Sequence, residues 1–131
     1  MRLVIDASAI VAMAMDEPER PAFQQALANA TEVLASPINL TEAGLVIVLR
    51  FGRFSPDEYD NWLSRIGVQE WDVDGAAALR AYLQYGRGVH RAGLNLGDCF
   101  AYALAKRLDA PLLYKGDDFA FTDIRPALQP T

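Results

Sequence analysis

The chain has 131 residues and a mass of 14.4 kDa, with 52% hydrophobic and 22% charged residues. This size and balance are typical of one globular domain over residues 1–131 and exclude a disordered or collagen-like chain. The net charge of −5 argues against a protein that only coats nucleic acid. The single cysteine favours a cytoplasmic protein. The sequence contains no apolar stretch of ~18 residues, so we expect no contact with a membrane.

The first half of the sequence predicts two short buried strands, each followed by a helix. Residues 3–5 form an apolar run without polar alternation, which is typical of a strand buried on both faces of a sheet. A helix with an apolar stripe is predicted to begin at Pro18 and reach residue 30. A second buried run, 33–35, precedes a serine cap and a first-turn proline, which predict a long helix over 36–51.

The second half continues this alternation. A cap, a proline and an acidic first turn predict a helix over 55–66, followed by a third strand over 68–73. Asp74 then caps an alanine-rich helix, which breaks down in a glycine-containing loop. The residues of this helix that we expect to point inward are Leu79, Tyr82 and Leu83.

The last predicted helix and strand lie near the end of the chain. Asn95 caps a helix that carries Cys99 on its apolar face and ends before Pro111. A fourth strand over 112–114 follows, and Ile124 marks a fifth short strand. Alternating strands and helices indicate an α/β domain, a short and mostly parallel β-sheet of about five strands flanked by helices.

Acidic residues occur where the predicted strands end and the helices begin. Asp6 follows the first strand, Glu42 and Asp98 lie in the first turns of two helices, and Asp117 and Asp118 follow the fourth strand. Open α/β sheets bind ligands at the carboxyl ends of their strands, so we expect these acids to meet there. Carboxylates within about 4 to 6 Å repel one another and either take up protons or bind a cation. Oxygen ligands favour Mg²⁺ or Mn²⁺, and such ions support phosphodiester hydrolysis.

Helix capping is the alternative interpretation of the same acids. The pairs Asn39–Glu42 and Asn95–Asp98 both have the spacing of a capping box, and acids in a first turn are stabilised by the helix dipole. Ser8 fits either interpretation, because it can cap a helix or orient the Asp6 carboxylate. Spacing alone leaves both interpretations open.

Four segments of the sequence are recognisable as a group. These are VIDASAIVAM, NLTEAGLVI, RAGLNLGDCFAYALAK and PLLYKGDDFAFTDI. Together they resemble the PIN-domain ribonucleases of the VapC toxin family, and the likeness spans almost the whole chain. The resemblance implies a three-layer sandwich around a short parallel sheet and Mg²⁺-dependent endonucleolytic cleavage of RNA, with Mn²⁺ able to substitute. It also implies a cognate antitoxin that blocks the site, within a homodimer or a toxin–antitoxin hetero-oligomer.

The resemblance also assigns metal-binding and catalytic positions. Asp6 matches the acid of the first strand, Glu42 the helix acid, and Asp98 the acid that opens the later helix. Asp117, Asp118 and Asp123 compete for the fourth position, and we favour Asp118. We expect Asp6 and Asp98 to hold Mg²⁺ directly, with the other two acids binding through water or holding a second ion. Asp123 is expected instead to orient or cap its loop.

Several other residues are candidates for contacts with substrate or partner. Ser8, Arg87, Arg91 and Lys115 are candidates for RNA binding, although a solvated loop explains the arginines equally well. A set of aromatic residues could form an antitoxin groove or simply pack two helices together. This set is Phe51, Phe54, Tyr59 and Trp62.

Two functions of other classes compete with the nuclease. A receiver or phosphatase-like domain also places an aspartate after its first strand and a lysine after a later one, as Asp6 and Lys115 are placed here. Such a domain would need a second acid beside Asp6, where this chain has Ala7 and Ser8. A non-catalytic binding module is the other alternative, and it would not bind Mg²⁺ or Mn²⁺.

Overall fold

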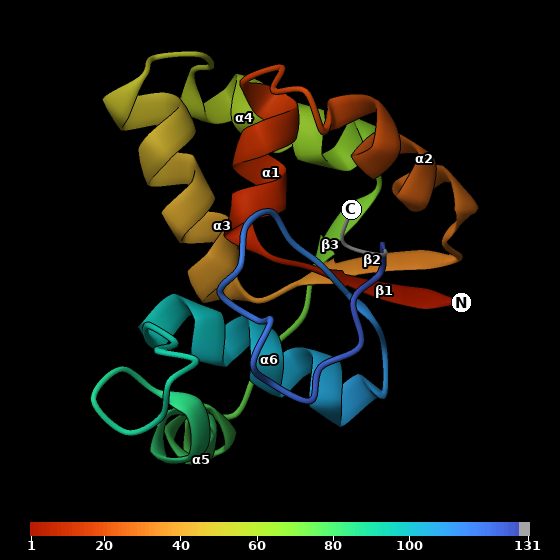
Figure 1. Cartoon of the computed structure of the whole chain (residues 1–131). Helices are drawn as coiled ribbons and strands as arrows, with labels where there is room; N and C mark the ends of the chain where they lie inside the picture. Colours follow the sequence, from red (N-terminus) through yellow and green to blue (C-terminus); the bar gives the residue numbers. More distant parts are fainter. Residues whose placement is uncertain (129–131) are drawn as a thin grey trace.

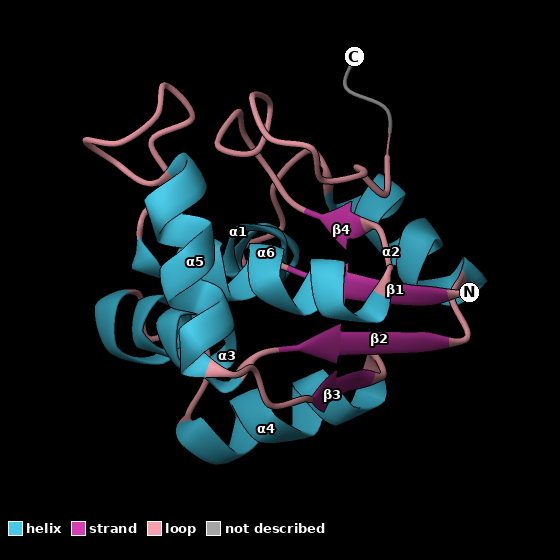
Figure 2. Ribbon diagram, turned by 90° about the horizontal axis from the view of Figure 1, so that it is seen from below, coloured by secondary structure: helices cyan, strands magenta, loops and turns pink. Residues whose placement is uncertain are grey.

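A four-stranded parallel sheet lies at the centre of the structure, a computed structural model that describes residues 1–128 (Figure 1). Its strands are Arg2–Ile5 (β1), Glu32–Ala35 (β2), Val68–Glu70 (β3) and Leu112–Leu113 (β4). They lie in the order β3-β2-β1-β4, and every neighbouring pair is parallel (Figure 2). The chain therefore builds the sheet outward from β1 to β3 and then returns to the other side of β1.

Helices cover both faces of the sheet and make a three-layer arrangement. One face is covered by Ala7–Ala14 (α1), Arg20–Asn29 (α2), Pro37–Gly44 (α3), the π-helix Leu45–Arg50 (η1) and Pro56–Arg65 (α4). The other face is covered by Gly75–Tyr85 (α5) and Leu96–Leu108 (α6). Figure 1 shows α5 and α6 on one side of the sheet and the other helices opposite. The expected α/β sandwich is confirmed.

The strands separate two apolar cores. Leu3 and Ile5 of β1 pack into the core beneath α1 to α4, whereas Val4 packs into the core beneath α5 and α6. Successive side chains of a strand point to opposite faces, so the residues of a strand that lie between two helical layers are expected to be apolar without alternation. This requirement explains the uninterrupted apolar runs of β1 and β2.

The sheet has four strands in the described chain, and the fifth predicted at Ile124 does not form. Leu112 accepts a hydrogen bond from Ala127 and donates one to Arg125, so the segment after Ile124 does approach β4. This contact remains an isolated bridge between Leu112 and Pro126. Proline has no backbone N–H, so it cannot continue the ladder of hydrogen bonds.

Some predicted boundaries also differ from the structure. The helix expected from Pro18 begins at Arg20, with a proline in its first turn. The helix over 36–51 forms, but its second half is the π-helix η1, and Gly52 follows it with a positive φ of 58°. The third strand ends at Glu70, earlier than expected.

The predicted inward face of α5 is confirmed for Tyr82, which is partly buried against the core that Val4 enters, but it is wrong for the two leucines. Leu79 and Leu83 are 60% and 62% exposed, and the residues that α5 buries are Ala78 and Ala81. Small side chains allow α5 to lie close against α6, which is the element it contacts most. The apolar periodicity identified a helix correctly, but it selected the larger residues as the buried ones.

None of the helices formed by residues 1–128 is long and apolar enough to cross a membrane.

The strand order determines where a ligand can bind. β2 and β4 lie on opposite sides of β1, so the connection that leaves β1 runs to one side of it and the connection that leaves β3 returns to the other side. In open α/β sheets a crevice opens at the carboxyl ends of the strands where this happens. Asp6 directly follows β1, and Asp118 lies a few residues beyond β4, so both acids belong to this edge.

Candidate active site

A pocket of about 540 Å³ lies at this edge of the sheet, and charged residues from distant parts of the sequence line it. These residues are Asp6, Glu17, Glu42, Asp98, Lys115 and Asp118. All four acids proposed from the sequence as metal ligands therefore line one pocket. The sequence correctly placed them at one edge, although they come from four separate segments of the chain.

Asp6 is buried at the end of β1 and caps helix α1. Its Oδ2 accepts hydrogen bonds from the Ser8 backbone N–H at 3.1 Å and from the Ser8 hydroxyl at 2.7 Å. Burial raises the pKa of Asp6, the Ser8 hydrogen bonds oppose this rise, and the charge of Asp118 adds to it. Ser8 thus orients the Asp6 carboxylate, and the cap of α1 is Asp6.

Asp98 is buried in the first turn of α6, where it forms a capping box with Asn95. The Asn95 backbone N–H donates to Asp98 Oδ2 at 3.1 Å, and the Asp98 N–H donates to Asn95 Oδ1 at 2.8 Å. Burial raises the pKa of Asp98 to about 7, and the charges of Asp6, Asp118 and Glu42 contribute to the rise. The predicted cap is therefore confirmed, and the same carboxylate also faces three other acids.

Glu42 does not form the capping box predicted from its spacing with Asn39. The cap of α3 is Ser36, whose hydroxyl accepts from the Asn39 N–H at 3.1 Å. The Asn39 side chain donates instead to Glu42 Oε1 at 3.2 Å. Burial raises the pKa of Glu42, Asn39 opposes the rise, and Asp6 adds to it. Glu42 therefore does not cap α3, and its carboxylate contributes negative charge to the pocket.

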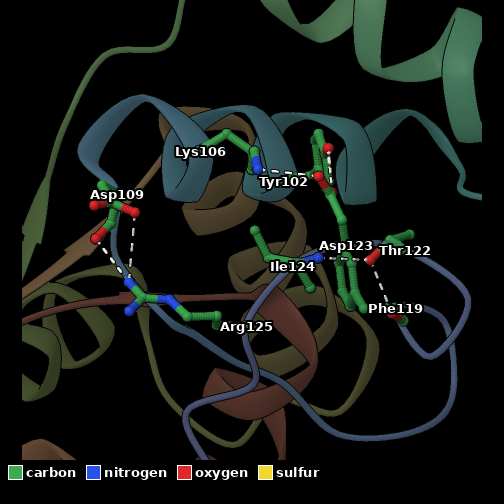
Figure 3. A network of polar contacts seen from close by, with 8 residues as sticks. All are labelled: Tyr102, Lys106, Asp109, Phe119, Thr122, Asp123, Ile124 and Arg125. Atoms are coloured by element: carbon green, nitrogen blue, oxygen red, sulfur yellow. Dashed lines mark hydrogen bonds and ion pairs between the residues drawn. The ribbon is translucent and has the colours of Figure 1, made fainter.

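Asp118 is the one of the three competing acids that lines the pocket. It lies on the turn after β4, and its charge contributes to the raised pKa of both Asp6 and Asp98. Asp123 is occupied elsewhere, because its carboxylate accepts from the Tyr102 hydroxyl at 2.6 Å and from Lys106 Nζ at 3.0 Å (Figure 3). Asp123 thereby ties the segment that carries Asp118 to α6, the helix that carries Asp98.

Replacing Tyr102 with phenylalanine is expected to lower the free energy of unfolding by about 1 kcal/mol at pH 7, because a hydrogen bond to a charged but partly exposed group is lost. The Tyr102 hydroxyl lowers the pKa of Asp123, so its contribution is present above pH 3.8 and is lost as the pH falls through the lower folded value. Urea unfolding of Tyr102→Phe at pH 7 and at pH 2 measures this difference. Tyr114→Phe is the control, since the Tyr114 hydroxyl makes no hydrogen bond within residues 1–128. Equal losses at both pH values would contradict the role of Asp123.

Lys115 has partners that sequence reasoning missed. Its ammonium contacts Glu17 at 2.8 Å and Glu19 at 3.3 Å, and its backbone N–H donates to the Ser8 hydroxyl at 3.0 Å. No ion pair joins Lys115 to Asp6 in the described chain, because Glu17 and Glu19 hold the Lys115 ammonium. Glu17 follows α1 without any capping or strand pattern, so the sequence offered no signal for it.

The two loop arginines do not line the pocket. Arg91 lies over the ring of Phe121 at 4.4 Å, on the segment that follows Asp118. Arg87 is exposed, and its backbone N–H donates to Leu94, which closes the loop between α5 and α6. Cys99 is fully buried, and burial raises its pKa to about 11, so it packs in the core as predicted and is no nucleophile.

The aromatic set packs mainly against itself. Tyr59 and Trp62 are buried, and the rings of Phe54 and Trp62 lie 5.6 Å apart. Phe51 is 55% exposed and stands outside this cluster. Three of the four rings therefore pack together, two of them on α4 and Phe54 on the loop that precedes it.

The donor set of the pocket fits a hard divalent ion. All four acids offer carboxylate oxygens, and three of them have raised pKa values because burial and neighbouring charges disfavour the ionised forms. A cation would relieve this repulsion. In residues 1–128 no three acids are gathered closely enough to enclose an ion by themselves. Water would therefore have to supply part of the coordination of a divalent ion bound here.

Comparison with known proteins agrees with this architecture. The family described as "PIN domain" matches residues 3–124. Two crystal structures have the same fold. VapC20 of Mycobacterium tuberculosis, a sarcin-ricin loop cleaving toxin, matches with a TM-score of 0.69 and 18% identity over 95% of this chain and 99% of that chain. VapBC2 of Rickettsia felis, solved with a promoter DNA fragment, matches with a TM-score of 0.68 and 16% identity over 96% of each chain. The chain belongs to the PIN-domain family.

Relatives at higher identity narrow the assignment. Ribonuclease VapC30 of M. tuberculosis is 48% identical over 131 residues, which covers 98% of this chain and 100% of the relative. Ribonuclease VapC of Mycolicibacterium smegmatis is 46% identical over 125 residues, 93% of this chain and 97% of the relative. Within the PIN-domain family, the chain belongs to the VapC ribonucleases.

Proposed function

We propose that residues 1–131 form one PIN-like domain that acts as a Mg²⁺-dependent endoribonuclease, the toxin of a type II toxin–antitoxin pair. The observation that carries this proposal is the pocket lined by Asp6, Glu42, Asp98 and Asp118, in a chain whose relatives are VapC ribonucleases. Carboxylates whose ionised forms are disfavoured by burial and by neighbouring charges are expected at a site that a divalent cation completes.

Asp6 and Asp98 are the direct ligands in this proposal, because both are buried and both are held by hydrogen bonds. Ser8 fixes the orientation of Asp6, and the Asn95 backbone fixes that of Asp98. Glu42 and Asp118 complete the site through water or a second ion. A bound divalent ion supplies positive charge to the phosphate and eases the deprotonation of water.

The proposed reaction is hydrolysis of an RNA phosphodiester. The oxygen of one water forms a bond to phosphorus, and the bond between phosphorus and the 3′ oxygen breaks. One proton of that water passes to the leaving 3′ oxygen. The products are a 5′-phosphate and a 3′-hydroxyl, and no protein nucleophile takes part.

Purified protein, freed of any antitoxin, tests the proposal directly. We expect cleavage of RNA in the presence of Mg²⁺ or Mn²⁺, loss of cleavage on addition of EDTA, and recovery when the ion is restored. Ligation-based mapping of the ends should find 5′-phosphates. Intact RNA after incubation with either ion, or fragments ending in a 2′,3′-cyclic phosphate, would reject the mechanism.

The partner in this proposal is a cognate antitoxin that covers the acidic pocket. It is supported by the family and by the VapBC2 complex, whose chain shares this fold. Whether the toxin alone is a homodimer, or assembles only with its antitoxin, is tested by light scattering of each form. Co-expression with the cognate antitoxin should suppress cleavage.

RNA phosphates are expected to contact Arg91, Arg87 and Lys115, with Ser8 reached from within the pocket. Arg91→Ala should raise KM about tenfold and leave kcat nearly unchanged, because a phosphate contact positions RNA without taking part in the reaction. The salt dependence of binding should also fall, by a slope of about one. Arg65→Ala, on the exposed end of α4, is the matched control. If Arg91→Ala and Arg65→Ala have the same KM, Arg91 does not contact the RNA.

A further inference from the structure

Asn39 is a fully buried polar residue on α3 whose side-chain hydrogen bonds reach both its own helix and α6. Its Oδ1 accepts from the Ser36 hydroxyl at 2.6 Å. Its Nδ2 donates to Glu42 Oε1 at 3.2 Å and to the backbone carbonyl of Gly97 at 3.0 Å. Both amide hydrogens therefore have acceptors, one on α3 and the other on α6. This side chain ties the Glu42 carboxylate to the residue next to Asp98.

Gly97 completes the contact from the side of α6. A Cβ added to Gly97 would collide with the Oε1, Oε2 and Cδ atoms of Glu42. Gly97 has no positive φ, so its backbone does not require glycine. Alanine would be the better helix former at this position. What the glycine provides is space, and the group that fills this space is the Glu42 carboxylate.

Glu42 needs such support because its environment works against a fixed position. Its side chain has several rotatable bonds and is only half-buried, and the charge of Asp6 repels it. An unsupported glutamate would turn toward solvent and away from the other acids. The Asn39 hydrogen bond and the space at Gly97 both act against this movement.

We propose that Asn39 and Gly97 act as a positioning pair that holds the Glu42 carboxylate against the first turn of α6, beside Asp98. The inference deepens the proposed function, since it names residues that set the distance between two acids of the same pocket. Neither residue carries charge, and neither lines the pocket. The pair acts through Glu42, in the way that outer hydrogen bonds orient the ligands of metal sites.

Gly97→Ala is the principal test, with Gly75→Ala as its matched control. Both replacements add a methyl group in the first turn of a helix, but a Cβ at Gly75 meets nothing within 4 Å. Calorimetric titration with Mn²⁺ alone, without RNA, is expected to show binding that is roughly 10- to 100-fold weaker in Gly97→Ala and unchanged in Gly75→Ala. Wild-type affinity in Gly97→Ala would overturn the proposal.

A double replacement separates an effect on Glu42 from a general effect on α6. In a Glu42→Ala background, Gly97→Ala should weaken Mn²⁺ binding no further, because the group displaced by the new methyl is already absent. The melting temperature gives the same answer without metal or RNA: the decrease caused by Gly97→Ala should be smaller in the Glu42→Ala background. Equal effects in both backgrounds would reject the pair.

Asn39→Leu tests the other member. Leucine has a similar volume and carries no charge, but it cannot donate to Glu42 or to Gly97. We expect the same loss of Mn²⁺ affinity, with kcat for RNA falling while KM stays near its wild-type value. If this variant does not fold, the Gly97→Ala comparisons still decide. A wild-type protein that fails to cleave RNA would reject the proposed function, whereas the metal-binding and melting comparisons would continue to test the pair.

Discussion

Asp98→Asn is expected to reduce RNA cleavage at least roughly 100-fold, which corresponds to about 2.7 kcal/mol of transition-state stabilisation. Asparagine keeps an oxygen in nearly the same place and can still accept from the Asn95 backbone N–H, so the capping box persists. What disappears is the negative charge that binds the ion. The measurement is the initial rate of RNA cleavage at saturating Mg²⁺.

The same variant is expected to be more stable than the wild type when metal is absent and the pH is high. The folded pKa of Asp98 is raised from 3.8 to about 7, so the folded state holds a proton that the unfolded state has lost between these values. The wild-type free energy of unfolding therefore falls as the pH rises from about 4 to above 7. Asp98→Asn lacks this decrease and should exceed the wild type at pH 8 by up to a few kcal/mol.

Urea unfolding in EDTA, at pH 4 and at pH 8, measures this difference. At pH 4 the Asp98 carboxyl of the folded protein is protonated, so the two proteins should have nearly equal stabilities. Asp57→Asn, in the exposed first turn of α4, controls for the loss of one negative charge. An Asp98→Asn variant that cleaves RNA at the wild-type rate, or that is less stable at pH 8, would show that Asp98 acts only as a helix cap.

The topology of a parallel sheet explains why the acids of this site could be located from the sequence. An aspartate that ends a buried strand, as Asp6 does after β1, must lie at the edge of the sheet. Parallel connections bring all such edges to the same side. Asp98 was placed in the same way, because Asn95 marks the start of its helix. Topology therefore predicted that these acids lie at one edge of the sheet, whereas their assignment as metal ligands came from the resemblance to the VapC family.

Ser8 and Asn95, which hold Asp6 and Asp98, were predicted from local spacing, but the supporting contacts between distant parts of the sequence were not. Asn39 contacts Gly97 across 58 positions of sequence, and Lys115 contacts Glu17 across 98. Local spacing carries no information about such contacts, and in the case of Asn39 it suggested a capping box with Glu42 that does not form. The choice between Asp117, Asp118 and Asp123 also needed the structure, because a turn of unknown shape separates them from β4.

Side-chain size misled the prediction for α5 for a different reason. Helical periodicity identifies a repeating face, but the inward face depends on how closely the neighbouring helix approaches. Here α5 packs closely against α6 through alanines, and Leu79 is left 60% exposed. Leu104 on α6 is completely buried in the core that Val4 also enters. The two leucines make a direct test of the two assignments.

Leu104→Ala is expected to lower the free energy of unfolding by about 2.7–5 kcal/mol, whereas Leu79→Ala should change it by less than about 0.5 kcal/mol. Both replacements remove the same atoms from a helix, so the difference reports burial and the cavity left behind. The total free energy of unfolding of a domain is about 5–15 kcal/mol, so the loss expected for Leu104→Ala is a large fraction of it. Urea unfolding of both variants in the presence of EDTA measures it.

The result also bears on the site, because Leu104 lies on the helix whose first turn holds Asp98. Leu104→Ala removes packing two turns away without touching a carboxylate, so the molecules that remain folded should bind Mn²⁺ with wild-type affinity. A loss of affinity that matches the loss of stability would mean that the position of α6 against the sheet sets the geometry of the pocket. Similar stability losses for Leu79→Ala and Leu104→Ala would mean instead that α5 buries its leucines, as the sequence periodicity predicted.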